Sequence, residues 1–321
     1  MKCIVLGLTL AALSAALFTL SFPPYGLWPL VFVGLVPMIV AQHRVLPRRL
    51  SRLDYWRWHV VANGGVFAAI DEVTFIRETA DGGIAAVLNP EGRGEAFLQV
   101  HPALHTPELE DEMLTVAEKH LALSSADGQK LYVWANGRDI LRQNILTRRG
   151  YVRGDRAEYQ RRRSLDTPIQ EARPAPGYTI RALGDVEEFP ARSWVSWQAF
   201  HPDAPDEDYE GWEWYHNIQR IPLYRRDLDI VAVAPNGEFA SFCTVWYDDV
   251  TRSGRFEPVG TASAHQQRGL GKAVMCEALR RLKRMRATMA YVGGFSPVAN
   301  ALYAAAGFTE YDLFAPWVKE W

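Results

Sequence analysis

The sequence predicts an α/β (α+β) protein with a mixed central sheet flanked by helices, preceded by a hydrophobic helical hairpin. Runs typical of strands alternate with amphipathic helical periods from residue 178 to the C-terminus. A similar order of elements, at similar spacing, occurs between residues 51 and 164. No charged residue lies between Lys2 and Arg44. We therefore expect two domains of similar plan in tandem behind the hairpin, which 321 residues can accommodate.

Residues 1–50 contain two apolar runs, which predict a hairpin that anchors the chain in a membrane. The first run, 4–22, would measure about 28 Å as a helix, close to the hydrocarbon thickness of a bilayer. The second run, 27–41, follows the turn at 21–26, whose prolines and glycine end the first helix. Lys2 and the arginines after the hairpin place both ends on the cytoplasmic side. A cleaved signal peptide and a buried extension are the alternatives.

The first domain is expected over residues 51–164. Its strands are predicted at 66–70, 72–78, 84–89 and 96–102 by their β-branched, aromatic and alternating residues. Residues 165–177 follow, rich in proline and without apolar periodicity. This composition predicts a linker to the second domain, which spans 178–321.

The second domain carries the clearer pattern. In chain order we expect a strand at 178–181, helices at 185–200 and 206–218, a hairpin of strands at 228–234 and 238–247, a strand at 255–261, a helix at 270–285, a strand at 290–292, a helix at 297–306 and closing strands at 308–317. Asp185 and Glu188 have the spacing of a helix cap. Pro235-Asn236-Gly237 supplies the hairpin turn.

The most informative segment is Gln266-Gln267-Arg268-Gly269-Leu270-Gly271-Lys272-Ala273, between a predicted strand and a predicted helix. Glycines leave backbone N–H groups uncovered, and the helix adds its positive N-terminal end, so an anion such as a diphosphate could bind there. A Rossmann fingerprint would need a third glycine, and a Walker loop would need Gly-Lys-Ser/Thr. The segment therefore predicts a different kind of anion cradle.

The pattern Gln-x-x-Gly-x-Gly resembles the diphosphate-binding signature of the GNAT N-acetyltransferases. A second block, from Asn300 to Phe308, resembles that family's Asn-x-x-Ala/Leu-x-x-Tyr-x-x-x-Gly-Phe region, in the expected order and at a typical distance. The resemblance implies a tandem acyl-CoA N-acyltransferase fold and acetyl-CoA as cosubstrate. His-Pro and arginine, frequent in the family, are replaced here by Ala262-Ser263 and Gln266, which suggests a less rigid cradle.

The resemblance also implies which residues bind the cosubstrate. The backbone of Val259 and Thr261 would pair with the pantetheine arm, and Gln266 would shape the loop. The diphosphate would lie against Arg268, Gly269, Leu270, Gly271 and Lys272, and Asn300 would orient the cosubstrate or its water.

Two residues are candidates for proton transfer. Tyr303 is the expected general acid, because a phenol can donate a proton to a departing thiolate. Glu257 is the expected general base, acting directly or through water on the acceptor ammonium. The alternatives are a packing role for Tyr303 and the absence of a dedicated base; Asp248, Asp249 and Glu213 are weaker candidates for the base.

The first domain repeats this plan without the cradle. Residues 104–110 occupy the corresponding position, contain no glycine, and include Glu108 and Glu110, which would repel a diphosphate. We therefore expect the first domain to be degenerate and the second to be catalytic.

Composition limits the other classes of function. A formal net charge of −2 and a basic run at 280–286 without interleaved aromatic residues argue against nucleic-acid binding. The three cysteines, Cys3, Cys243 and Cys276, lack the spacing of metal ligands, so no metal site is expected.

The predicted function is acetyl transfer from acetyl-CoA to a primary amine of a small molecule or protein, by a cytoplasmic catalytic domain. One alternative is a non-catalytic acyl-CoA sensor. Another follows from residues 1–45, where the stretch 20–30 resembles the N-terminal membrane segment of apolipoprotein N-acyltransferases. No Glu-Lys-Cys set of the nitrilase type follows that segment, which tells against lipoprotein acylation.

Overall fold

A computed structural model describes residues 73–126, 128–219 and 224–321. The hairpin predicted at 1–50 and the strand predicted at 66–70 lie outside the described residues. None of the described helices is long and apolar enough to cross a membrane.

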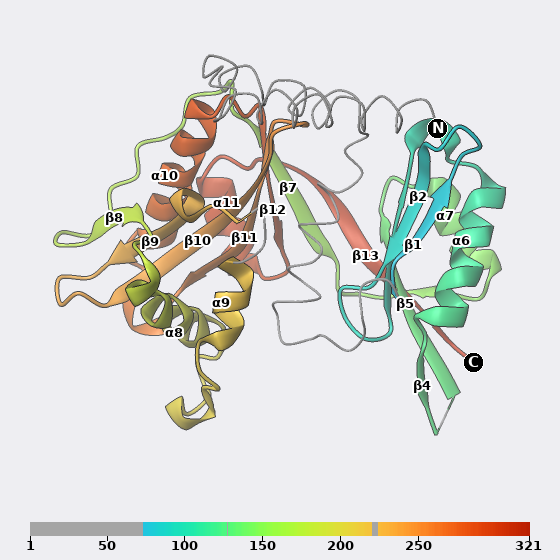
Figure 1. The fold of residues 1–321 in the computed structure, drawn as a ribbon, viewed down its shortest axis with the longest axis horizontal. Helices are drawn as coiled ribbons and strands as arrows, with labels where there is room; N and C mark the ends of the chain where they lie inside the picture. Colours follow the sequence, from blue (N-terminus) through green and yellow to red (C-terminus); the bar gives the residue numbers. More distant parts are fainter. Residues whose placement is uncertain (1–72, 127, 220–223) are drawn as a thin grey trace, which may run out of the picture. The chain divides into compact units, whose positions relative to one another are not determined.

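The described strands form one sheet of 13 strands, drawn in Figure 1. They are β1 (Phe75–Glu78), β2 (Ile84–Asn89), β3 (Glu95–Val100), β4 (Leu123–Ser125), β5 (Gly128–Asn136), β6 (Val152–Arg153), β7 (Glu158–Ser164), β8 (Thr179–Ala182), β9 (Asp229–Val233), β10 (Phe239–Asp248), β11 (Ser253–Thr261), β12 (Met289–Gly294) and β13 (Glu310–Glu320). Their order is β1-β2-β3-β5-β13-β7-β12-β11-β10-β9-β8, with β4 beside β5 and β6 beside β13. The mixed sheet expected from the sequence is confirmed.

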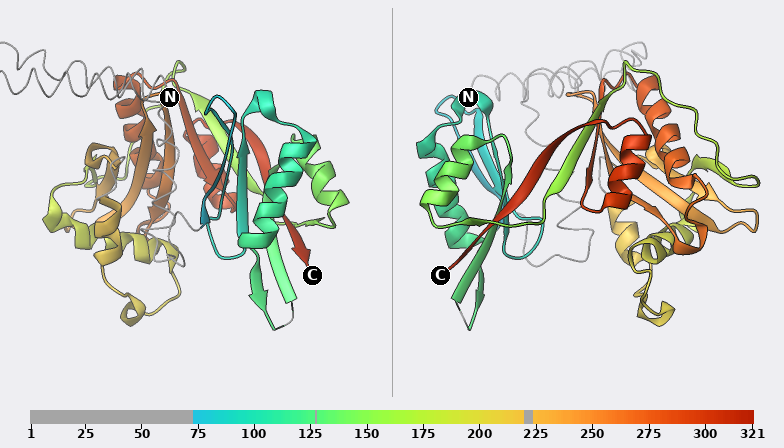
Figure 2. Two further views of the ribbon diagram at one scale, coloured as in Figure 1. Left: turned by 45° about the vertical axis from the view of Figure 1, so that its right-hand side comes forward. Right: turned by 180° about the vertical axis from the view of Figure 1, so that it is seen from behind.

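Six α-helices are described: α6 (Pro107–His120), α7 (Ile140–Arg148), α8 (Phe189–Phe200), α9 (Glu213–Gln219), α10 (Leu270–Arg284) and α11 (Pro297–Ala305). Short 3₁₀ turns, η3 to η7, cover residues 102–104, 186–188, 206–208, 226–228 and 263–265. α10 packs on β8 to β11, whereas α8 packs on β10 and β11. The view from behind in Figure 2 shows α10 and α11 in front of the C-terminal strands.

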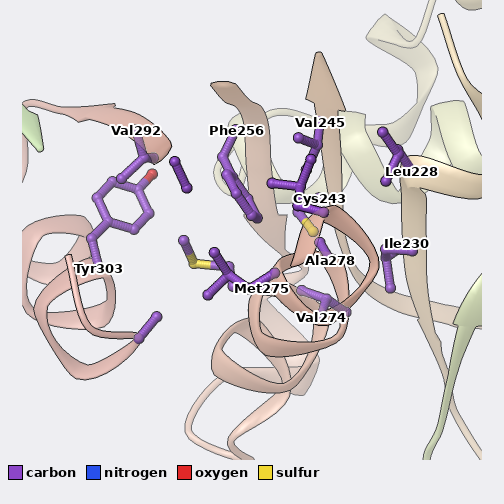
Figure 3. Packing of buried hydrophobic residues seen from close by; sticks show 14 of the residues in the cluster. Leu228, Ile230, Cys243, Val245, Phe256, Val274, Met275, Ala278, Val292 and Tyr303 are labelled. Atoms are coloured by element: carbon purple, nitrogen blue, oxygen red, sulfur yellow. The ribbon is translucent and has the colours of Figure 1, made fainter. Parts of the chain in front are cut away.

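The C-terminal strands have a hydrophobic core on each face. On the α10 face, the predicted periodicity of α10 is confirmed, because Leu270, Val274, Ala278 and Leu282 are all buried. Figure 3 shows part of this core, in which Tyr303 of α11 lies beside Val292 of β12. Burying each such aliphatic side chain stabilises the fold by about 1.5–3 kcal/mol relative to exposure.

The core on the α8 face includes Phe189, Val195, Phe242, Trp246 and Ala262. A third core lies among α6, α7 and strands β2, β3 and β5. Separate cores on opposite faces of β10 and β11 fix which side each residue of these strands presents.

One predicted helix is wrong. Residues 206–218 form a 3₁₀ turn at 206–208 and then α9 from Glu213, rather than one continuous helix. Tyr209 between them is extended, its hydroxyl donates to Ser193 Oγ over 2.8 Å, and its ring packs edge-on against Trp194. These contacts with α8 stabilise a break that local helix propensity does not show.

The most unexpected feature is an exchange of strands across residues 165–177. β7 precedes this segment but lies between β12 and β13, pairing Tyr291 with Arg162 and Phe314 with Glu158. β13 in turn pairs with β5, with Trp317 opposite Val133. The sheet of each half therefore includes a strand from the other half.

Candidate active site

β11 contains one residue more than its partner. The pair Val245–Phe256 is followed by the pair Cys243–Val259, so three steps along β11 face two along β10. Such a bulge turns the following residues to the opposite face of the sheet. As a result Phe256 packs in the α10-side core, Arg255 and Glu257 lie on the α8 side, and Val259 packs again on the α10 side.

β11 and β12 separate just beyond this bulge. Their parallel pairing runs from Ser253–Met289 to Phe256–Val292 and then ends, while β12 continues to Gly294 beside β7. Val259 and Thr261 pair only with β10 among the described strands. Their edge therefore borders a gap between two neighbouring parallel strands, where sequence reasoning expected the pantetheine arm.

Glu257 lies at this gap in a polar network. Its carboxylate accepts a hydrogen bond from Arg255 Nε over 3.1 Å, and its side chain is 28% exposed. Arg255 also donates to Gln160 Oε1 over 3.1 Å, and Gln160 bonds to Glu158. The indole of Trp246 donates to the main-chain oxygen of Glu257 over 2.6 Å. Glu257 is thus both held in place and reachable from solvent.

Tyr303 lies on the other side of the gap, in α11. Only 7% of the residue is exposed, and its ring packs over Gly294 at the end of β12. Burial, and then the carboxylates of Glu257 and Glu158, raise the pKa of the Tyr303 hydroxyl above its ordinary value. The phenol therefore stays protonated at neutral pH, as a proton donor must.

Asn300 is already engaged by the protein. Its Nδ2 donates to the main-chain oxygens of Gly294 and Ser296, each over 3.0 Å, and its Oδ1 accepts from Arg161 Nε over 2.6 Å. Arg161 also donates to the main-chain oxygen of Phe308 over 3.0 Å. These bonds indicate that Asn300 positions α11 against β12 and β7.

The loop before α10 has the conformation of an anion cradle. Gly269 is the N-cap with a φ of 72°, and Gln267 also has a positive φ of 59°. The first N–H groups of a helix have no acceptor within it, so those of α10 are directed at this loop. A Cβ at Gly271 would lie 3.0 Å from Leu302 and 3.5 Å from Thr261 Oγ1, so this glycine also permits close packing of α10.

Side chains of the loop contact the preceding chain. Arg268 donates to the Tyr178 hydroxyl over 2.7 Å, and Gln266 donates to the main-chain oxygen of Thr261 over 3.4 Å. Lys272 donates to Gln170 Oε1 over 2.8 Å. The segment 165–177 therefore lies along the N-terminal part of α10, where sequence analysis expected only a linker.

The structure thus brings the predicted residues to one end of the sheet, with Glu257 and Tyr303 on opposite sides of the gap. Four residues that surround them were not predicted: Glu158, Gln160, Arg161 and Arg255. The strand β7 was not predicted from the sequence, and nothing in the sequence indicated that residues 158–164 would join the sheet of the second half.

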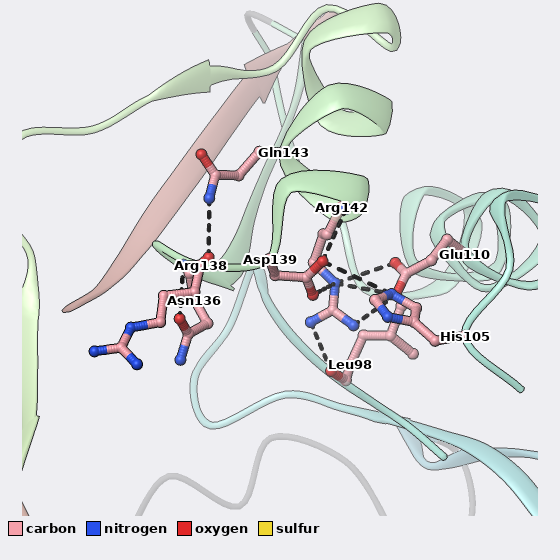
Figure 4. Close-up of polar contacts among 8 residues, drawn as sticks. All are labelled: Leu98, His105, Glu110, Asn136, Arg138, Asp139, Arg142 and Gln143. Atoms are coloured by element: carbon pink, nitrogen blue, oxygen red, sulfur yellow. Dashed lines mark hydrogen bonds and ion pairs between the residues drawn. The ribbon is translucent and has the colours of Figure 1, made fainter. Parts of the chain in front are cut away.

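A cluster of His105, Glu110 and Asp139 was not predicted, and its ligand atoms all lie within 4.8 Å of one another (Figure 4). Arg142 donates hydrogen bonds to the Glu110 carboxylate from Nη2 over 2.7 Å and from Nε over 3.1 Å. Its Nη1 donates to the main-chain oxygen of Leu98 over 2.8 Å. A guanidinium so close to the carboxylate opposes a metal cation. We interpret the cluster as an ion-pair centre that joins α6, α7 and β3.

Residues 188–308 match the family model described as Acetyltransferase (GNAT) family. No curated protein matches the chain. Several solved structures share its fold. A GCN5-related N-acetyltransferase from Sphaerobacter thermophilus aligns at 18% identity and a TM-score of 0.61, covering 79% of this chain and 82% of that one.

Two further structures support the same fold. A tandem GNAT protein from the clavulanic acid biosynthesis pathway aligns at 16% identity and a TM-score of 0.55, covering 75% of this chain and 81% of that one. A GCN5-related N-acetyltransferase from Kribbella flavida aligns at 13% identity and a TM-score of 0.51, covering 84% of this chain and 95% of that one. Residues 188–308 are therefore similar to the acetyltransferase (GNAT) family, and the chain shares the fold of these solved structures.

Proposed function

We propose that the chain transfers an acetyl group from acetyl-CoA to a primary amine of a small molecule or protein, with Glu257 as general base and Tyr303 as general acid. The observation that carries this proposal is the bulge in β11. The partly exposed carboxylate of Glu257 lies at this bulge, next to the gap between β11 and β12. The buried, protonated phenol of Tyr303 lies on the other side of that gap.

The residues at the gap fit acetyl-CoA. The edge of β11 at Val259 and Thr261 is unpaired with β12 over the stretch where a pantetheine arm could lie. At the end of β11, the cradle loop from Gln266 to Lys272 could present helix N–H groups to a diphosphate, and Arg268 and Lys272, which bind Tyr178 and Gln170, add positive charge nearby. Asn300 contributes indirectly, by fixing the start of α11.

Acetyl-CoA supplies the acetyl group as a thioester, whose C–S bond breaks as the amine nitrogen forms a new C–N bond. Glu257 accepts the proton that the acceptor ammonium must lose, either directly or through one water. Tyr303 donates its phenolic proton to the leaving sulfur, which would otherwise depart as a thiolate, and the second proton that the nitrogen loses as the amide forms restores the phenol. Arg255 holds the Glu257 carboxylate in place through a hydrogen bond of 3.1 Å.

Labelled acetyl-CoA and a panel of primary amines test the proposal. Purified protein should release free thiol and acetylated amine in equal amounts, at a rate above that without protein. Tight binding of acetyl-CoA with no thiol release to any amine would contradict it and would support a non-catalytic sensor.

We also propose, from sequence alone, that residues 1–45 attach the chain to the inner face of the cell membrane. The motivation is the long uncharged stretch followed by arginines. Fractionation should find full-length protein with membranes and a form beginning at residue 51 in the soluble fraction. Full-length protein recovered wholly in the soluble fraction would exclude the anchor.

A further inference from the structure

The segment between β7 and β8 runs antiparallel to α10, and we call residues 165–178 the strap (Figure 1). In the second half of α10, Arg280 donates a hydrogen bond to the main-chain oxygen of Gln170 over 3.3 Å. At the other end of α10, the main-chain N–H of Ala175 donates to the main-chain oxygen of Arg268 over 3.0 Å. The strap therefore follows α10 toward its N-terminus and ends against the cradle loop.

Apolar side chains attach the strap to the core beneath α10. Leu165 is buried in this core, and Ile169 and Tyr178 pack against it from the two ends of the strap. The prolines at positions 168, 174 and 176 restrict the backbone between these contacts. The groups that the strap presents to the cradle loop are therefore held by a fixed piece of chain.

Tyr178, the last residue of the strap, connects the cradle loop to the 3₁₀ turn before it. Its hydroxyl accepts a hydrogen bond from Arg268 over 2.7 Å and shares one of 2.9 Å with His265 Nδ1. A tyrosine hydroxyl can accept one hydrogen bond while it donates another, so both contacts can exist together. Arg268 also donates to the main-chain oxygen of Ala264 over 3.2 Å. One hydroxyl thus ties the turn, the loop and the strap together.

The cradle loop needs support of this kind. Gln267 has a φ of 59°, a region that residues with a Cβ rarely adopt. The loop contains no proline, and Gly269 and Gly271 add conformational freedom, so its own sequence does not fix its shape. The strap bonds to Arg268, the residue that lies between Gln267 and Gly269, through both its main chain and its side chain. These bonds therefore act on the strained part of the loop.

Resting on the proposed function, we propose that the strap is part of the cosubstrate site. Tyr178 and the N–H of Ala175 are positioning groups that act through Arg268, and they hold the cradle loop in the conformation that binds the diphosphate of acetyl-CoA. Without them the loop would spend part of its time in other conformations, and the apparent affinity for acetyl-CoA would fall by that fraction. The segment that joins the two predicted domains thereby contributes to the site of the second.

Calorimetric titration with acetyl-CoA tests this inference on two tyrosines, one near each end of α10. Tyr178→Phe keeps the packed ring and removes the hydroxyl at the cradle, so the Kd of acetyl-CoA should rise about fivefold or more. Tyr247→Phe is the matched control, because the Tyr247 hydroxyl donates to the main-chain oxygen of Met285 over 3.1 Å, just after the end of α10. It should change the Kd by less than about twofold. In an Arg268→Met background, Tyr178→Phe should also add less than about twofold, because the group through which it acts is gone.

S-acetylpantetheine separates positioning of the loop from a general loss of structure, because it carries the thioester without the diphosphate. With an amine that the protein acetylates, Tyr178→Phe should lower kcat/KM for acetyl-CoA by about fivefold or more, through KM, and leave kcat/KM for S-acetylpantetheine unchanged. An equal fall for both thioesters would give Tyr178 a structural role only and would overturn the inference.

The outcomes also separate this inference from the proposed function. If acetyl-CoA binds to the wild-type protein but no amine releases thiol, the proposed function fails, and the calorimetric comparison still decides the role of the strap. An unchanged Kd in Tyr178→Phe overturns the inference, as does the absence of acetyl-CoA binding to the wild-type protein. A lower Kd in Tyr178→Phe overturns it too, because the strap would then compete with the cosubstrate.

Discussion

At the scale of single residues, Tyr303 and Asn300 lie in the same helix but have different roles. Asn300 makes three hydrogen bonds to protein groups, so its amide is used in holding α11. Tyr303 is buried beside two carboxylates that favour its protonated form. The motif predicted both residues, but only the contacts distinguish Asn300, which holds α11 in place, from Tyr303, the proposed proton donor.

Replacing Tyr303 by phenylalanine isolates the proton donor, because the ring and its packing are retained. We expect kcat to fall by roughly 10- to 10⁴-fold and the Kd of acetyl-CoA to stay nearly constant. Since the pKa of Tyr303 is raised, its ionisation should weaken the folded state only as the pH rises above about 10, the ordinary value for tyrosine. An unchanged kcat, with chemistry rate-limiting, would return Tyr303 to a packing role.

Arg161 links β7 to α11, and its replacement tests that link. Arg161→Met removes two hydrogen bonds and leaves Asn300 Oδ1 without its donor, so the free energy of unfolding should fall by about 1–3 kcal/mol, with a lower kcat. Arg162→Met on the same strand is the control. It removes ion pairs to Glu310, which is 67% exposed, and Asp312, and should cost less than about 1 kcal/mol. If denaturant titrations find that both variants lose the same free energy of unfolding, the contact between Arg161 and Asn300 contributes no more than an exposed ion pair.

At the scale of elements, local patterns predicted most of the second half. The hairpin around Pro235-Asn236-Gly237 and the buried face of α10 are confirmed, because turn chemistry and apolar period depend on neighbours in the chain. The bulge in β11 could not be predicted, since it is defined only by comparison with its partner β10. The break before α9 was missed for a similar reason: contacts with α8 determine it.

The cradle loop permits a test that uses a second glycine of positive φ as its control. Gly269 has a φ of 72° and Gly237, in the β9–β10 turn, has a φ of 89°. Alanine at either position should destabilise the fold by about 1–2 kcal/mol. Only Gly269→Ala, which reshapes the loop before α10, should also weaken acetyl-CoA binding, by about tenfold or more. Calorimetric titration that finds equal affinity in both variants would remove the cradle from the cosubstrate site.

At the scale of the whole molecule, the sequence predicted two halves of similar plan, but it did not predict how the strands of these halves pair with one another. Residues 158–164 show no clear alternation, so neither the strand β7 nor its partners in the sheet were predicted. β7 and β13 each pair across more than a hundred residues, which no local pattern encodes. The division into two domains at residues 165–177 therefore remains a prediction. In the sheet, β7 from before this segment pairs with strands that follow it, and β13 from after it pairs with β5, which precedes it.

This exchange predicts how the chain responds to a cut between its halves. A protease site introduced within 165–177 should yield two fragments that stay together during gel filtration, because separation would remove β7 from between β12 and β13 and β13 from beside β5. Each loss would expose two rows of backbone hydrogen-bonding groups and part of a core. The fragments should part only in denaturant, and the fragment 178–321 expressed alone should fail to fold or to bind acetyl-CoA. A soluble, folded 178–321 that binds acetyl-CoA with the affinity of the intact chain would show that the exchanged strands are dispensable and that the second half is an independent domain.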